Sequence, residues 1–266
     1  MRDGFVKHIY YKIIGNGDPL VMIAGLAADH STWTPLVNHL ANRYKIILFD
    51  NRGIGRSSIP DDGDCTIEKM SEDVLMLLNV LDIEKSNIVG HSLGGYVAQE
   101  FSSKYPEKVG KLVLLSSKTR TQAVQNLYIE TALSMMKRDI PRELIIKNSL
   151  CWLCSDAYLR NPQNIINSIT IGMQKPLEES RRSYFYQVNA ALNFDTTHSA
   201  NKIALPTLII AGEKDILVTM HDAKHLNETI KNSQLKIIKN MAHLSHIEVP
   251  EKVAQILQNF LISPTL

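Results

Sequence analysis

The stretch Asn87-Ile88-Val89-Gly90-His91-Ser92-Leu93-Gly94-Gly95 decides how this chain folds. A short apolar run leads into it, and a helical pattern follows, in which Val97, Phe101 and Tyr105 are four residues apart. Glycines on both sides of Ser92 permit a tight strand-to-helix turn, because a residue without a Cβ atom lets neighbouring backbone pass closely. Such a turn exposes the serine hydroxyl in front of a helix N-terminus, which stabilises negative charge. The stretch therefore predicts a nucleophilic serine, and the alternative is a glycine-rich turn with an incidental serine.

Short strand-like runs alternate with helical patterns on both sides of this turn. The runs that we expect to be strands are 8–14, 20–24, 46–50, 87–90, 112–116, 207–212 and 235–238. They read as buried on both faces, which predicts an α/β fold with a mostly parallel sheet between two layers of helices. The pair Asn16-Gly17 is a tight-turn signal and predicts that the first two runs pair antiparallel.

Residues 118–200 interrupt the alternation. They contain no convincing strand and read as several helices, with breaks near Pro141, Pro162 and Pro176. The alternation resumes at Ile203. We therefore expect a core domain formed by residues 1–117 and 201–266, with residues 118–200 inserted as a helical lid.

Composition places further bounds on the function. The chain has 266 residues, of which 44% are hydrophobic and 21% charged, so it can bury a large core. A net charge of +2 gives no nucleic-acid footprint. The first residues lack the apolar stretch of a signal peptide, and no run of about 18 apolar residues could span a membrane. Three cysteines, an odd number, do not suggest a disulfide framework. These features predict a soluble, cytoplasmic protein, monomeric or homodimeric, that binds neither nucleic acid nor membrane.

A nucleophilic serine needs a base and a carboxylate that orients the base. In open α/β sheets such groups follow the carboxyl ends of strands. Asp215 follows the run 207–212 and His243 follows the run 235–238. We therefore predict Asp215 as the acid and His243 as the base.

Neighbouring residues compete for these two roles. Glu213 lies close to Asp215 but comes earlier in the turn, and His246 lies farther from the strand end than His243. His91 adjoins the serine, but adjacent side chains point in different directions, so we interpret it as a packing residue. His221 and His225 belong to a polar helical pattern and are expected at the surface.

An acyl-transfer site also needs backbone N–H groups aimed at the developing oxyanion. One is expected from Leu93, directly after the serine. The second is expected from Leu26 in the loop Ala24-Gly25-Leu26-Ala27-Ala28, which follows an early strand. The alternative is that this loop is only a turn made of small residues.

Taken together, these motifs resemble the α/β-hydrolase superfamily over nearly the whole chain, and most closely its carboxylesterase and enol-lactonase branch. The resemblance rests on the stretch around Ser92, on 50–57 (Asp-Asn-Arg-Gly-Ile-Gly-Arg-Ser), and on the order Ser92, Asp215, His243. It implies an eight-stranded, mainly parallel sheet, a variable lid and no cofactor. The chain departs from the family pattern at Ala24, where many relatives have histidine. It departs again just before His243, where they have glycine.

Two other motifs have plain structural interpretations. The glycines of 50–57 follow a strand, but the segment lacks the third glycine and the Lys-Ser/Thr pair of phosphate-binding loops. The segment Cys151-Trp152-Leu153-Cys154 has the spacing of a redox or zinc motif, yet no second ligand pair lies near it. We expect the 50–57 segment to form a turn beside the site and the two cysteines to lie in the core of the lid. We expect no metal.

The predicted function is hydrolysis of a carboxylic ester through an acyl-enzyme on Ser92. A lactone, or a carbon–carbon bond beside a ketone, could be cleaved by the same groups. A serine nucleophile argues against haloalkane and epoxide chemistry, which would need an aspartate. The alternative from a different class is a non-catalytic small-molecule receptor on the same fold.

The expected lid is more basic than the rest of the chain, with ten Lys and Arg against seven Asp and Glu. Lys137, Arg138 and Arg142 cluster within about one helical turn, and Arg181-Arg182 form a second pair. A solvated helix face explains such clusters. The sharper hypothesis is that the lid docks an acidic acyl carrier protein, as in hydrolases that resemble pimeloyl-carrier methyl ester esterases.

Overall fold

The computed structural model describes residues 1–263 except positions 62, 139, 175 and 193, and its strands form one eight-stranded sheet. The order across the sheet is β1 (Arg2–Val6), β2 (Ile9–Ile14), β4 (Tyr44–Phe49), β3 (Asp18–Ile23), β5 (Ser86–His91), β6 (Val109–Leu115), β7 (Thr207–Gly212) and β8 (Ser233–Ile238). All neighbours from β4 to β8 run parallel. Only β1 with β2 and β2 with β4 pair antiparallel among the described strands. The predicted mostly parallel sheet is confirmed.

The prediction that the first two apolar runs pair with each other is wrong. β4 lies between β2 and β3, and the turn that contains Asn16-Gly17 crosses the start of β4 instead of closing a hairpin. Gly17 has φ +116, and a Cβ atom there would lie 2.2 Å from the Arg43 carbonyl oxygen. A turn sequence fixes only the local direction of the chain. The apolar 44–49 run, wholly or partly buried, takes the place beside β2 instead.

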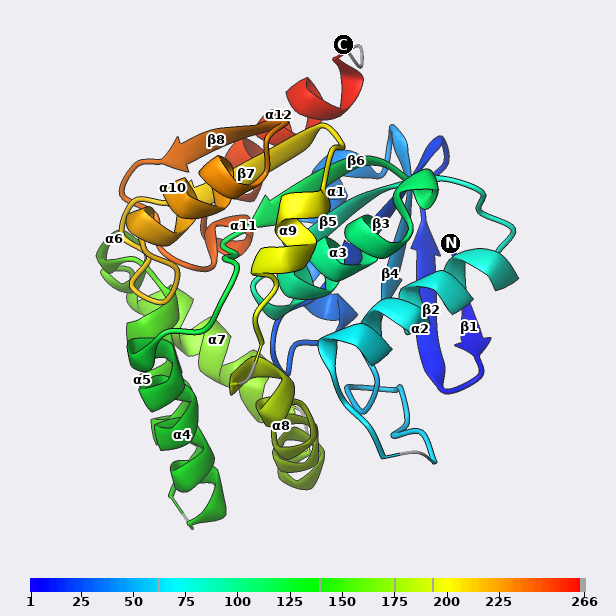
Figure 1. Ribbon diagram of the computed structural model, residues 1–266. Coiled ribbons are helices and arrows are strands. Elements are labelled where there is room, and N and C mark those ends of the chain that lie inside the picture. Colours follow the sequence, from blue (N-terminus) through cyan, green and yellow to red (C-terminus); the bar gives the residue numbers. More distant parts are fainter. Residues whose placement is uncertain (62, 139, 175, 193, 264–266) are drawn as a thin grey trace.

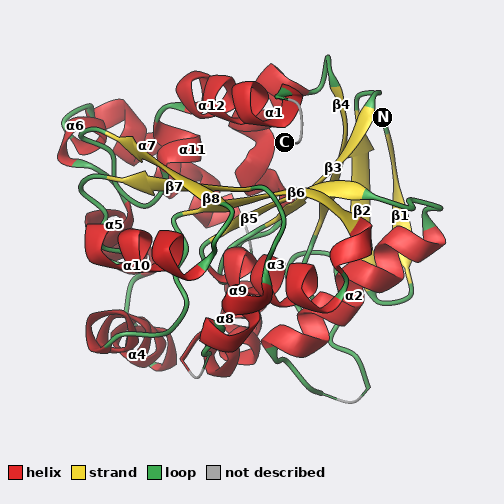
Figure 2. Ribbon diagram, turned by 45° about the horizontal axis from the view of Figure 1, so that its top comes forward, coloured by secondary structure: helices red, strands yellow, loops and turns green. Residues whose placement is uncertain are grey.

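Helices cover both faces of the sheet (Figure 2). On one face lie α1 (Thr34–Leu40), α11 (Ser245–Glu248) and α12 (Pro250–Ile262), and on the other α2 (Ile67–Val80), α3 (Leu93–Lys104) and α10 (Met220–Thr229). Two 3-10 helices, η1 (His30–Trp33) and η2 (Pro106–Lys108), lie in loops. Each face has its own apolar cluster, because side chains alternate along the buried strands. In β3, for example, Val21 and Ile23 pack on the α2 and α3 side, whereas Leu20 and Met22 pack on the α1 and α12 side.

Between β6 and β7 the chain is helical, and we call residues 118–200 the helical insert. It contains α4 (Ala123–Lys137), α5 (Arg142–Leu153), α6 (Asp156–Leu159), α7 (Pro162–Gln174) and α8 (Leu177–Leu192), and it ends within α9 (Thr197–Lys202), which packs on α3. Three of these helices begin at or just after Pro141, Pro162 and Pro176. In Figure 1, α4, α5, α7 and α8 stand together, green to olive, away from the sheet.

The two ends of the helical insert lie side by side. Arg120 and Asp195 form an isolated antiparallel bridge, and the Thr196 N–H donates to the Thr119 carbonyl over 2.6 Å. The Thr196 hydroxyl also lies 2.9 Å from Oε1 of Gln99, a fully buried residue of α3. The root of the insert is therefore tied to the helix that follows Ser92.

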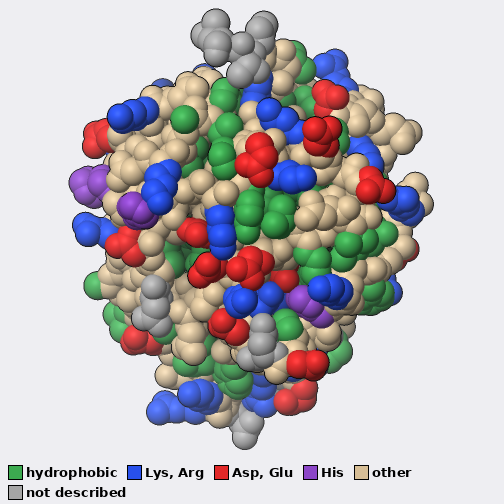
Figure 3. Space-filling view, turned by 45° about the vertical axis from the view of Figure 1, so that its right-hand side comes forward, with side chains coloured by type: hydrophobic (Ala, Val, Ile, Leu, Met, Phe, Trp, Pro, Cys, Tyr) green, Lys and Arg blue, Asp and Glu red, His purple; other side chains and the backbone are tan. Residues whose placement is uncertain are grey.

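The described surface carries charges of both signs. Figure 3 shows basic and acidic side chains interspersed over one face of the molecule, without a large area of a single sign. No helix among the described residues has the length and apolar character needed to cross a membrane.

Candidate active site

Ser92 stands at the junction between β5 and α3 in a strained conformation. Its φ is +53° and its ψ is −119°, a region that non-glycine residues rarely adopt and that costs about 1–3 kcal/mol. Two backbone hydrogen bonds hold it there: the Ser92 N–H donates to the Leu115 carbonyl (3.0 Å), and the Gly95 N–H donates to the Ser92 carbonyl (2.9 Å). The predicted strand, sharp turn and helix are all present in this order.

The glycine at position 94 is required by the close approach of α3 to the sheet. A Cβ atom there would lie 2.2 Å from the carbonyl oxygen of Ile23, in the adjacent strand β3. Backbone on both sides leaves no flexible group that could move aside. The turn around Ser92 can therefore form only because the helix presents bare backbone at this point.

Asp215 and His243 meet above the carboxyl ends of β7 and β8. The His243 Nδ1 atom lies 2.8 Å from Oδ2 of Asp215, and both side chains are buried. The other carboxylate oxygen, Oδ1, accepts hydrogen bonds from the Leu217 and Val218 N–H groups, each over 2.9 Å. Because a carboxylate oxygen accepts, Nδ1 carries the proton, and Nε2 is left free to receive one.

Ser92 and His243 line the same cavity, together with Leu26 and Leu93. No hydrogen bond joins Ser92 to His243 within the described part of the chain. Catalytic hydrogen bonds are often long in the absence of substrate and tighten when it binds. The arrangement therefore brings the candidate nucleophile, base and acid to one site, although the hydrogen bond between Ser92 and His243 is not formed.

The two competitors lie elsewhere. Glu213 is exposed, and its carboxylate accepts from the Asn240 N–H over 3.0 Å. His246 is completely buried in α11, where its ring is tilted against those of Trp33 and His91, with centroid distances of 4.9 Å and 4.4 Å. Burial, with a smaller contribution from His243, lowers the pKa of His246 to about 3. A histidine held neutral and away from Asp215 is a packing residue.

His91, which we interpreted as a packing residue, has a further contact. Its Nε2 donates to the backbone carbonyl of His243 over 3.1 Å, and the two ring centroids are 5.0 Å apart. Burial, and then the nearby rings of His246 and His243, hold the pKa of His91 well below its usual value. A neutral His91 therefore supports the loop that carries His243. No local signal could have revealed this contact, because it joins residues 91 and 243 across two strands.

The two expected oxyanion donors flank Ser92. Leu93 is the first residue of α3, and Leu26 lies in the loop after β3. Neither backbone N–H donates to another described group. A Cβ atom on Gly25 would lie 3.3 Å from the Ser92 Cβ atom, so this loop passes directly beside the serine. Ala27, which follows Leu26, has a φ of +55°. The Ala28 N–H donates to the Gly25 carbonyl and closes the turn.

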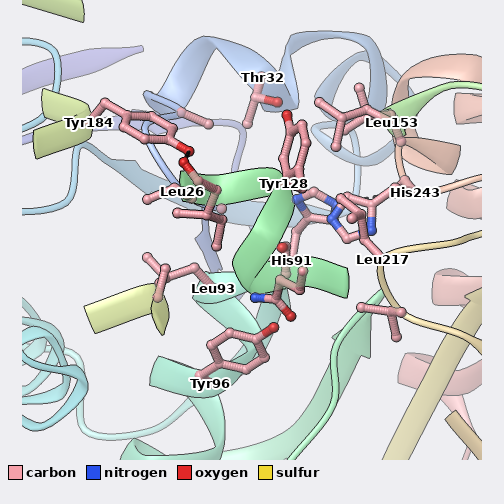
Figure 4. A pocket seen from close by; sticks show the side chains of 18 of the residues that line it. Leu26, Thr32, His91, Leu93, Tyr96, Tyr128, Leu153, Tyr184, Leu217 and His243 are labelled. Atoms are coloured by element: carbon pink, nitrogen blue, oxygen red, sulfur yellow. Dashed lines mark hydrogen bonds between the residues drawn. The ribbon is translucent and has the colours of Figure 1, made fainter. Parts of the chain in front are cut away.

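The cavity over Ser92 has a volume of about 250 Å³ and an apolar wall. The helical insert supplies Tyr128 from α4, Leu153 from α5 and Tyr184 from α8, and the core supplies Leu26 and Leu217 (Figure 4). The described lining residues include no Lys, Arg, Asp or Glu. The cavity therefore suits an uncharged, largely apolar molecule.

The segment after β4 has a structural role beside this site. Asp50 Oδ1 accepts from the His30 N–H and lies 2.7 Å from its Nδ1, while Oδ2 accepts from the Arg56 N–H. Arg52 forms a buried ion pair with Asp73 of α2. Asp29, His30 and Asp50 could together approach a metal ion. However, both carboxylate oxygens of Asp50 are already engaged by the contacts with His30 and Arg56.

The cysteine pair also has no catalytic setting. Cys154 is buried directly after α5, as expected for the core of the lid, whereas Cys151 is exposed, so the expectation is wrong for Cys151. Burial raises the pKa of Cys154 to about 12, so its sulfur is a thiol rather than the thiolate that redox or metal chemistry requires.

Comparison with known proteins identifies the family and agrees with the fold. The family described as the alpha/beta hydrolase fold matches residues 18–139. The 3-oxoadipate enol-lactonase 1 of Acinetobacter baylyi is 28% identical, over 93% of this chain and 90% of that protein. A poly(3-hydroxyalkanoate) depolymerase of Ectopseudomonas oleovorans is 30% identical, over 91% of this chain and 84% of that protein. The structure of a thermophilic esterase from Thermogutta terrifontis superposes with a TM-score of 0.81 at 26% identity, covering 95% of this chain and 92% of that one.

Proposed function

The chain belongs to the α/β-hydrolase family, and we propose that it hydrolyses an uncharged carboxylic ester or lactone through an acyl-enzyme on Ser92. One observation carries the proposal: the strained Ser92 opens on the same cavity as His243, whose Nδ1 lies 2.8 Å from Asp215. A hydroxyl, an imidazole and a buried carboxylate arranged in this way are the components of a Ser-His-Asp catalytic triad.

In this mechanism His243 Nε2 takes the proton of Ser92 as its oxygen attacks the ester carbonyl. Asp215 stabilises the imidazolium, and the N–H groups of Leu26 and Leu93 donate to the oxyanion. Collapse of the tetrahedral intermediate breaks the bond to the alcohol, which leaves with the proton from His243. Water, activated by His243, then attacks the acyl-enzyme and releases the acid and Ser92.

The cavity supports the choice of an uncharged substrate. A substrate with a carboxylate would lose its hydration there without meeting a cationic side chain among the described lining residues. An unpaired buried charge is costly. We therefore expect short, neutral acyl groups to be preferred over acyl groups of similar size that end in a carboxylate.

The first experiment is labelling by a fluorophosphonate probe, with Ser92→Ala as the control. Labelling of the native chain but not of the variant supports the nucleophile. The second is a series of chromogenic esters in which a terminal methyl group is replaced by a carboxylate. Turnover of the neutral esters, with a loss on the carboxylates, supports the substrate class. Labelling without turnover of any ester or lactone favours carbon–carbon bond cleavage. If the native chain is not labelled and also hydrolyses no ester or lactone, a non-catalytic receptor is favoured.

A second candidate is an ester whose acyl group is attached to an acidic carrier protein. A hollow of about 670 Å³ between α4 and α8 supports it. Its lining includes the three basic residues Lys137, Arg181 and Arg182, the acidic residue Glu178, and Met136 and Phe185. Lys137 and Arg182 are exposed there. Two other residues of the basic set are engaged locally: Arg142 donates to Ser180, and Arg181 pairs with Glu178. Lys175 and Asp139, which entered the charge count, lie outside the described residues.

A further inference from the structure

Helix α8 of the helical insert reaches the loop that carries Leu26. The side chain of Gln187 is completely buried, and its Oε1 accepts a hydrogen bond from the Ala27 N–H over 2.9 Å. Tyr184 and Ala191, one turn before and one turn after Gln187, both line the cavity over Ser92. In Figure 4, Tyr184 and Leu26 lie on the same side of that cavity. An element of the insert therefore touches the backbone next to an expected oxyanion donor.

The hydrogen bond falls on a conformation that needs support. Ala27 has a φ of +55°, in the left-handed region that an L-residue with a Cβ atom disfavours. The Ala28 N–H donates to the Gly25 carbonyl over 3.2 Å, and this turn alone leaves the Leu26–Ala27 peptide plane free to rotate. The bond to Gln187 fixes that plane, because it holds the one N–H group that the plane contains.

The other half of the amide makes no contact that would explain the residue. Gln187 Nε2 is buried and has no hydrogen-bond partner among the described groups. Burying an unpaired donor is unfavourable. The contribution of the Gln187 side chain is therefore the oxygen that accepts the hydrogen bond from the Ala27 N–H.

We propose that Gln187 is a positioning residue for the oxyanion site. By fixing the Leu26–Ala27 peptide from the helical insert, it keeps the adjoining Leu26 N–H directed into the cavity over Ser92. The proposal rests on the ester hydrolysis proposed above. The oxyanion site is therefore complete only while α8 is seated on the core.

The test replaces Gln187 by Met, which is similar in length but lacks a strong acceptor. We expect kcat on a neutral chromogenic ester to fall about 10- to 100-fold, less than for full removal of an oxyanion donor, with little change in KM. The affinity of an aryl boronic acid, which forms a tetrahedral adduct with the serine, should fall by a similar factor. The matched control is Ser183→Ala, on the same helix, where the buried Ser183 hydroxyl donates to the Gly53 carbonyl over 3.0 Å. It should leave kcat within about threefold, because the Gly53 loop supplies no oxyanion donor.

A double variant separates positioning from general loosening of the insert. Glycine adopts a positive φ readily, so Ala27→Gly should restore part of the kcat that Gln187→Met loses, at least about threefold. Equal losses for Gln187→Met and Ser183→Ala, or no recovery in the double variant, would overturn the positioning role. Failure of the proposed function gives a different result, because the native chain would then hydrolyse no ester and Ser92 would not be labelled.

Discussion

At the scale of single residues, the Asp215 carboxylate has a distinct task for each oxygen. Oδ1 accepts from two backbone N–H groups and Oδ2 faces Nδ1 of His243. The carboxylate is therefore fixed in rotation, and it meets only donors. No neutral side chain of the same shape can satisfy both sides, since an amide presents one acceptor and one donor.

We accordingly expect Asp215→Asn to lower kcat by about 10⁴-fold while the chain stays folded. The amide nitrogen would face either the backbone N–H groups or the Nδ1 proton, and the second arrangement forces the wrong tautomer on His243. Steady-state kinetics, with circular dichroism as the check on folding, measure this. Glu213→Gln is the control, and a larger loss there would mean that the acid has been misassigned.

The assignment of the base is tested by replacing His243 and His246 separately. Ser92→Ala and His243→Ala should each lose about 10⁴- to 10⁶-fold in kcat, because the nucleophile and its base act as a unit. His246→Phe should keep most of the activity, since this ring packs against Trp33 and does not contact Asp215. Activity in His243→Ala together with an inactive His246→Phe would reverse the assignment.

The buried histidines also predict how stability depends on pH. Burial lowers the pKa of His246 to about 3 and also lowers that of His91, whereas both titrate near 6.5 in an unfolded chain. Below pH 6.5 the unfolded state therefore binds more protons than the folded state. Their contribution to stability is complete above pH 6.5 and is lost as the pH falls below it, in the case of His246 toward pH 3.

Each of these histidines should reduce the free energy of unfolding by up to about 1.4 kcal/mol per pH unit in that window. Urea unfolding at pH 7.5, 6, 5 and 4 measures the slope. His246→Phe should remove about one proton's share of it. An unchanged slope in this variant would show that His246 is already charged in the folded protein.

At the scale of helices and strands, apolar runs were sufficient to find most elements but not their partners. The predicted runs 46–50 and 207–212 correspond to β4 (Tyr44–Phe49) and β7, and the turn at Ser92 joins β5 to α3 as predicted. β1 was missed because Arg2-Asp3-Gly4 is polar, as suits an exposed edge strand. The pairing of β2 was predicted wrongly because a turn signal is local, whereas the position of β4 is set by packing across the whole sheet.

The candidate site divides in the same way. Residues tied to strand ends, namely Ser92, Asp215 and His243, follow from local pattern and order. Contacts between distant segments, such as Gln187 with Ala27 and His91 with His243, depend on how the insert and α11 pack on the core. No spacing in a single sequence records those distances.

The junction of β5 with α3 gives a prediction at this scale. Gly94→Ala should destabilise the fold by about 3 kcal/mol or more, because its Cβ would meet the Ile23 carbonyl oxygen and neither backbone can yield. Thermal or urea unfolding measures the loss. Gly63→Ala is the control: unlike Gly94, Gly63 has a positive φ, +62°, but it has open space around it, so only conformational strain of about 1 kcal/mol applies. Similar losses in both variants would contradict the packing explanation.

At the scale of the whole molecule, the helical insert contributes to two hollows with different linings. It helps to close the cavity over Ser92, whose described lining residues include no Lys, Arg, Asp or Glu, and it supplies Lys137 and Arg182 to the hollow between α4 and α8. The face shown in Figure 3 carries interspersed charges, without a large area of a single sign. The carrier hypothesis therefore predicts that an acidic partner docks at this hollow.

If a carrier docks there, reversing both exposed charges, Lys137→Glu with Arg182→Glu, should lower kcat/KM on a carrier-linked ester about 10-fold or more at low salt. The same variant should leave a small chromogenic ester unaffected, and the difference should shrink as salt is added. Arg160→Glu is the control, since Arg160 is exposed on the insert but pairs locally with Asp156. Equal effects on both substrates would leave a small-molecule esterase as the better description.

The bridge between Arg120 and Asp195 has an evolutionary consequence. Because the two ends of the intervening chain already touch, that stretch can be exchanged for one of different length without moving β6 or β7. The groups proposed for chemistry lie outside it, and much of the cavity wall lies inside it. New substrate ranges can therefore arise by transplanting one continuous piece of gene. A transplant would keep full turnover only if it again supplied an acceptor for the Ala27 N–H.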